Sequence, residues 1–251
     1  MGYKFGDWTY KVYDKTFLKD VHLCISFPRV ENIDGQKDAL AKFFRGFFKI
    51  DVELEKLTGV LHVKSSEEDI CLDFKLDSVE IVMRRPAYKS FGLTEAMMKA
   101  ACNYMQILHV SQVNKLEFVK YNELEYTLSE RPMGVLEVMK GVFSNNLIDA
   151  IKDESLKDND AYLKTLTRWE KVLTMADTET KSIFNIEYGF SRKNIDSKTG
   201  ILALKTRIET DEDGIEFAGL NDKVVLFNKI LDDAFHWCVR QEVIAMMEQK
   251  G

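Results

Sequence analysis

The stretch KLEFVKYNELEY, residues 115–126, decides how the fold of this chain is read. Its residues alternate between two sides, and one side carries Leu116, Phe118, Lys120, Asn122 and Leu124. Because successive side chains of a β-strand point to opposite faces of a sheet, this alternation predicts a strand. The strand closes the first half of the chain, so the elements before it set the expected topology.

The residues before this strand show both strand and helix patterns. We expect strands at 21–28, at 50–63 with a continuation after Gly59, at 70–76 and at 79–83, and helices at 37–49 and 93–108. The alternation shifts its phase at Asp77-Ser78, which predicts either a tight turn or a bulge. The order is β-α-β-β-α-β with an extra strand at the phase shift. This order is compatible with a ferredoxin-like sandwich of helices on one sheet face.

The second half has a different pattern. We expect a helix at 132–151, a charged break at 152–160, strands at 165–176, 182–190, 200–210 and 214–217, and a long helix at 222–248. Gly-containing turns between the last strands are typical of antiparallel hairpins. We therefore predict an α+β protein with a half at 1–128 and a half at 129–251, the second being an antiparallel sheet with a C-terminal helix. Whether the halves share one core stays open.

Composition narrows the class of protein. The chain has 251 residues, of which 45% are hydrophobic, and this content favours a packed core over disorder. A net charge of −6 disfavours nucleic acid as a partner without excluding it. No signal peptide pattern and no apolar run of about 18 residues occur, so we expect no membrane partner. The four cysteines form no Cys-x-x-Cys pair and fit free thiols in a cytoplasmic protein.

A search for catalytic and cofactor motifs gives no candidate. The sequence has no phosphate-binding Gly-rich loop, no nucleophile elbow, no His-Glu-x-x-His and no EF-hand loop. The pairs His22/Cys24 and His236/Cys238 hold the four donors of a zinc site. On a helix, however, residues i and i+2 point about 200° apart and do not readily share an ion. We expect no cofactor and no metal, and we nominate no catalytic residue.

Two polar residues interrupt the apolar side of the 115–126 strand. Lys120 and Asn122 are unfavourable there unless they are paired or face a cavity. One interpretation is that the strand twists to the sheet edge and both side chains are solvated. A second is a hydrogen-bonded structural pair. A third is contact with a ligand or partner, in which Tyr121 would take part.

A second candidate contact region is the basic and aromatic turn RRPAYK, residues 84–89. Arg84, Arg85 and Tyr88 are the residue types that grip a phosphate or stack on a base. A solvated connection between a strand and a helix is the alternative interpretation of this turn.

The segment LEFVKYN, residues 116–122, also resembles a motif of a known family. It is similar to the strand ending in Arg-Tyr-Asn of a sporadically distributed prokaryotic family of unknown function. The segment YKSF at 88–91 and the internal His236 of the last helix extend the resemblance. The resemblance implies an architecture and no activity, and the scattered distribution of the family implies a link to mobile or defence genes. Lys120 stands where the family more often has Arg.

These observations lead to three function hypotheses. The first is a non-enzymatic protein-interaction or accessory protein of a prokaryotic cell, which binds a protein partner or self-associates through the helices at 132–151 and 222–248. The second is a nucleic-acid or nucleotide-binding protein that uses Arg84, Arg85, Lys120 and Tyr121. The third is an enzyme whose carboxylate chemistry leaves no visible motif.

Overall fold

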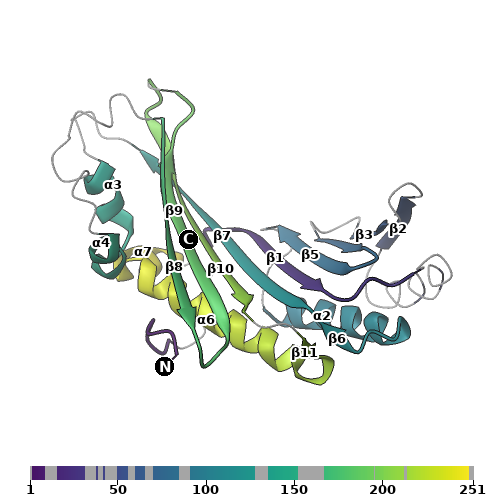
Figure 1. Ribbon diagram of the computed structural model, residues 1–251. Helices are drawn as coiled ribbons and strands as arrows, with labels where there is room; N and C mark the ends of the chain where they lie inside the picture. The colour runs from purple at the N-terminus through teal and green to yellow at the C-terminus, as the bar shows by residue number, and fades with distance from the viewer. Residues whose placement is uncertain are drawn as a thin grey trace.

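The computed structural model describes residues 2–8, 16–31, 38, 42, 50–55, 60–65, 70–84, 91–127, 135–151, 167–194, 196–211 and 214–248. Nine strands form one sheet in the order β2-β3-β4-β5-β1-β7-β10-β9-β8 (Figure 1). Their bounds in that order are Ile50–Glu55, Val60–Ser65, Ile70–Phe74, Ser78–Arg84, Leu18–Ser26, Lys115–Thr127, Thr199–Thr210, Ser182–Ser191 and Arg168–Asp177. The short strands β6 (Gln112–Val113) and β11 (Ile215–Glu216) pair with each other.

The helices lie along one face of the sheet (Figure 1). They are α2 (Phe91–Ile107), α3 (Val135–Val142), α4 (Asn145–Ile151), the short helix η3 (Phe217–Gly219), α6 (Leu220–Cys238) and α7 (Gln241–Glu248). The mixed α+β class predicted from the sequence is confirmed. None of the helices in the described part of the chain is long and apolar enough to cross a membrane. The expected helix at 37–49 lies outside the described residues, except for Asp38 and Lys42.

The strand order of the first half differs from the ferredoxin-like expectation. A ferredoxin-like sheet has four strands, whereas here a meander β2-β3-β4-β5 pairs with β1 through β5, so that six strands of the first half lie in the sheet. The physical reason lies at the phase shift, where a tight turn places β5 next to β4; Lys75 N donates to Ser78 O at 2.8 Å. Because of this additional strand, it is β5 and not β4 that pairs with β1.

The two long helices expected at 132–151 and 222–248 are both broken. The breaks face each other, because Phe143 and Val239 form an isolated antiparallel bridge. Ser144 N donates to Cys238 O at 2.8 Å, and Arg240 N donates to Val142 O at 2.9 Å. Backbone groups that would continue each helix bond the other chain segment instead. These contacts separate α3 from α4 and α6 from α7.

The two halves of the chain contribute to one sheet and one core. β7 of the first half pairs with β10 of the second half from Glu117↔Glu209 to Thr127↔Thr199. α6 lies under these two strands and buries Val224, Phe227 and Leu231. A single cluster of buried side chains includes residues of both halves. The sheet therefore has one face covered by helices, and we call the other its open face.

Candidate functional site

Lys120 lies on the helix-covered face of β7. It is 5% exposed, and Asn122 is 7% exposed. β7 lies between β1 and β10, so it is not an edge strand. Lys120 Nζ donates to Asp232 Oδ1 of α6 at 2.6 Å. The structure therefore favours the hydrogen-bonded pair, and the interpretation of a solvated sheet edge is wrong for both residues.

The surroundings of this ion pair hold it in place. Asn228 Nδ2 donates to the second oxygen of Asp232 at 3.1 Å. Asn122 Nδ2 donates to the carbonyl oxygen of Leu204 on β10 at 3.4 Å. A charge removed from water is tolerated only when its partner and further hydrogen bonds are in place. Lys120 and Asp232 thus fasten α6 to the centre of the sheet.

Tyr121 points to the opposite, open face. Its hydroxyl donates to Glu123 Oε1 at 2.7 Å. Partial burial, followed by the contact with Glu123, raises the pKa of Tyr121 to about 12. The phenol is therefore neutral at physiological pH and presents a polar ring to the open face.

A hollow of ≈ 340 Å³ lies beside this ring. Its floor includes Gly189 and Ala203, which face each other across β9 and β10. A Cβ at Gly189 would lie 2.4 Å from the backbone oxygen of Trp169, so the close approach of β8 requires glycine there. Two neighbouring positions with little or no side chain leave the sheet backbone uncovered.

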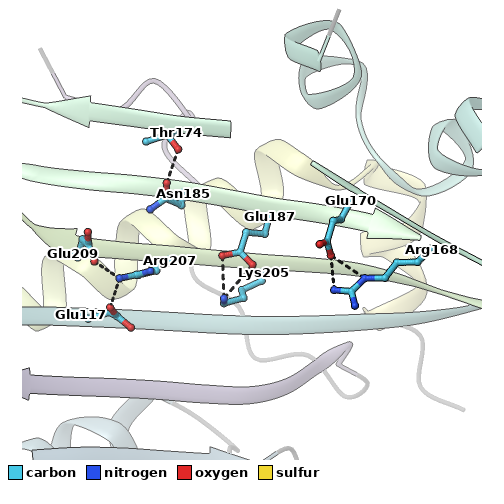
Figure 2. Close-up of polar contacts among 9 residues, drawn as sticks. All are labelled: Glu117, Arg168, Glu170, Thr174, Asn185, Glu187, Lys205, Arg207 and Glu209. Carbon is cyan, nitrogen blue, oxygen red and sulfur yellow. Dashed lines mark hydrogen bonds and ion pairs between the residues drawn. The ribbon is translucent and has the colours of Figure 1, made fainter. Parts of the chain in front are cut away.

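Charged pairs surround the hollow, and Figure 2 shows them on the open face. Lys205 Nζ lies 3.0 and 3.1 Å from the two carboxylate oxygens of Glu187. Arg168 donates twice to Glu170 Oε2, at 2.6 and 3.1 Å. Thr174 and Asn185 form a neutral pair at 2.7 Å.

Arg207 bridges two glutamates near the other end of the same strands (Figure 2). Its guanidinium binds Glu209, and it lies 2.6 Å from Glu117. Partial burial opposes ionisation of Glu209, but hydrogen bonds and the charges of Lys115 and Arg207 outweigh it and lower the pKa of Glu209. All three cations drawn in Figure 2 are bound to carboxylates. A phosphate group would therefore have to compete with carboxylates for each of them.

The open face carries one continuous row of side chains across six strands. The register pairs run from Arg84 on β5 through Asp20, Tyr121, Lys205 and Glu187 to Val172 on β8. Two of the predicted contact residues, Arg84 and Tyr121, thus share this face. Lys120 and Asn122 are on the other face. Arg85 and Tyr88 lie outside the described residues.

Sequence reasoning missed the partners of these residues. Alternation places Lys205 and Glu187 on the polar sides of their strands, but it contains no information on register. Asp232 was hidden because a charged residue on an amphipathic helix normally faces water. The sequence signal for such a partner was Lys120 itself, because a lysine in an apolar row is unfavourable unless it is paired, solvated or facing a cavity.

The four histidine and cysteine donors of the two His-x-Cys pairs do not form a site in the described residues. Within these residues no group of three or more His, Cys, Asp or Glu side chains is placed to hold a metal ion. Cys24 is on the open face, whereas Cys238 is fully buried on the helix side, and burial raises its pKa. Comparison with family models and with curated proteins finds no match for this chain.

Proposed function

We propose that this chain is a non-enzymatic interaction protein and that its protein partner binds the open face of the sheet around Tyr121. The observation that carries the proposal is the hollow at Gly189 and Ala203, which has ion pairs around it and which the described helices leave uncovered (Figure 1). Protein interfaces commonly combine a less polar centre with a polar rim. The exposed Val172 extends the apolar part of this surface to the sheet edge.

The helix faces give this proposal no support. The interaction hypothesis from the sequence places the partner on the apolar sides of 132–151 and 222–248. In the described parts of these segments most apolar side chains pack inside the chain, including Val138, Met139, Leu147, Phe227, Leu231 and Ile244, while Val225, Leu226 and Met246 are exposed. A surface already buried against the sheet is not available to a partner. We therefore assign the partner to the open face.

Nucleic acid is the less favoured partner for the same face. Affinity for a phosphate backbone comes from lysine and arginine groups that exchange counterions for phosphates. Lys205, Arg168 and Arg207 are each bound to a glutamate. The accessory role in a prokaryotic cell is likewise a proposal, and it rests on the family resemblance of residues 116–122.

A photo-crosslinking experiment tests the proposal. A benzoylphenylalanine at Val172 samples the open face, and one at Met246 of α7 is a matched control, because both side chains are 59% exposed. We expect the Val172 position to yield a discrete protein adduct in the native cell, and we expect Tyr121→Ala to weaken it. A second copy of the chain in the adduct would identify self-association, and another protein would identify a heterologous partner.

The Met246 control distinguishes specific binding at the open face from random collision. Equal adducts from both positions would mean random collision, and the proposal would be rejected. Absence of any adduct at Val172, in a folded protein at native concentration, would reject it as well.

A further inference from the structure

A second pocket, of ≈ 290 Å³, lies on the helix side of the molecule, away from the open face. It is enclosed by the N-terminal segment, the start of α2 and α6. Its lining residues are Trp8, Phe91, Val225, Asn228, Lys229, Asp232, Asp233 and His236. The size is at the lower end of the range for small-molecule sites. No motif in the sequence indicates this pocket, because its walls come from three distant segments.

One wall of the pocket is aromatic. The rings of Trp8 and His236 stack with centroids 5.3 Å apart and planes 16° from parallel. His236 Nδ1 donates to the backbone oxygen of Asp232 at 2.8 Å, which fixes the orientation of the imidazole. Phe91 lines the pocket as well. Such a wall attracts apolar groups and, through the negative faces of the rings, cations.

The polar end of the pocket consists of two carboxylates fixed in position. Asp232 accepts from Lys120 at 2.6 Å and from Asn228 at 3.1 Å. Asp233 accepts from the backbone N–H of Trp8 at 3.3 Å and from Lys229 Nζ at 2.9 Å. Both carboxylates line the pocket together with Trp8 and His236, and these contacts hold them in position.

The contacts of Lys229 show what kind of chemical group the carboxylate end of the pocket binds. Its ammonium lies 2.7 Å from Asp7 and 2.9 Å from Asp233. Hydrogen bonds to Asp7 and then to Asp233 raise the pKa of Lys229. The side chain is nevertheless 52% exposed, so its ammonium is not sealed in. The carboxylate end of the pocket thus already binds a primary ammonium, that of Lys229, and the Lys229 side chain can move out into solvent.

Asn228 supplies an independent observation. It lines the same pocket, is 6% exposed, and its Oδ1 has no hydrogen-bond partner among the described residues. A buried acceptor without a donor is unfavourable, and native structures contain few of them. A ligand N–H donor at this end of the pocket would satisfy Oδ1 if the amide turned toward it, and the ligand ammonium would then replace the Nδ2 bond to Asp232 that the turn breaks.

We propose that this pocket binds a small organic ammonium compound, with its apolar body against Trp8 and Phe91 and its ammonium at Asp232 and Asp233. The ligand ammonium takes the place of the Lys229 ammonium, which moves out to solvent. Lys229 is therefore a competing internal cation that limits the affinity. This site is separate from the open face, and a test of it does not depend on whether a protein partner binds the open face.

Calorimetric titration with two matched probes tests the charge requirement. The probes are 2-phenylethylammonium and 2-phenylethanol, which share the aromatic body and differ in charge. We expect the ammonium compound to bind about tenfold more tightly, because a cation gains both the ring contact and the carboxylates. The anion 3-phenylpropionate is expected not to bind. Equal affinity for the ammonium and the alcohol, or no binding of the ammonium, would overturn the proposal.

Variants of the full chain separate binding from folding. Lys229→Ala is expected to tighten binding of 2-phenylethylammonium about two- to fivefold, which corresponds to release of an exposed ion pair. A gain of affinity does not arise from misfolding, so an unchanged or weaker affinity in this variant would contradict the model of a competing cation. Asp233→Asn is expected to weaken binding at least about fivefold, with thermal unfolding as the fold check. Glu170→Gln, on the open face, is the control and should leave the affinity unchanged.

Discussion

Lys120 and Tyr121 are neighbours in the chain, but they belong to two different regions of the molecule. Lys120 lies under α6, where its ion pair with Asp232 has side-chain exposures of 7% and 25%. On the open face the pair of Lys205 and Glu187 has exposures of 36% and 37%. The two pairs have the same chemistry and differ in their access to water.

This difference separates a structural role from a binding role. A desolvated charge that loses its partner is strongly unfavourable, whereas an exposed pair contributes little because water replaces the partner. The helix side of β7 is therefore constrained by folding, and charges on the open side can be exchanged at small loss of stability. This difference is consistent with our proposal that a partner binds the open face, where charged side chains can change at small loss of stability.

The largest expected effect comes from breaking the buried pair. Asp232→Ala leaves the Lys120 ammonium, which is 5% exposed, without its carboxylate. We expect a loss of about 3 kcal/mol in the free energy of unfolding, measured by urea denaturation. The double variant Lys120→Met/Asp232→Ala should recover most of that loss. A single-variant loss below about 1 kcal/mol would place this pair in the same class as the exposed pairs.

A backbone constraint of the open face comes next. Gly189→Ala would bring a Cβ within 2.4 Å of Trp169 O, so β8 must shift. We expect a loss of about 2 kcal/mol in the free energy of unfolding. Gly141→Ala in α3 is the matched control: its Cβ would have 3.9 Å of space, and alanine favours a helix, so this change should stabilise by about 0.5 to 1 kcal/mol. Tolerance of alanine at Gly189 would show that β8 is not held closely against β9.

We expect an intermediate effect for the partly buried Glu209 of the open face, and it should appear as a dependence of stability on pH. The folded pKa of Glu209 is lowered from 4.5, so its contribution to stability is full above that value and is lost as the pH falls through the folded pKa. Thermal unfolding of the wild type at decreasing pH should show this loss. Glu209→Gln should lack that component, which we expect to be below about 1 kcal/mol. Glu170→Gln, 63% exposed on the same face, is the control.

The smallest effect is expected for the exposed pair. Lys205→Met removes the contact with Glu187 and should change the free energy of unfolding by about 0.5 kcal/mol or less. The change should shrink further in high salt, because the Debye length falls. Lys205→Arg, which keeps the charge, should match the wild type. A loss comparable to that of Asp232→Ala would remove the distinction between the two faces.

Much of the local structure was predictable from short patterns. Alternation located β7, β9 and β10, and helical spacing located α2, because each pattern depends only on which side of one element is buried. The site was predictable only in part. Tyr121 and Arg84 lie on the open face, but Lys120 and Asn122 bind residues of α6 and β10 instead. Their partners lie 112 and 82 positions away, beyond the reach of any local pattern.

By itself the sequence determined the α+β class and the identity of most strands, and it left open whether Lys120 is solvated, paired or in contact with a ligand. Only the tertiary structure decided the strand order, the opposed breaks at Phe143 and Val239, and which acid meets Lys120. The reason is physical. Periodicity records how one element divides its side chains between core and water, whereas register, helix breaks and ion pairs arise from contacts between elements that packing alone brings together.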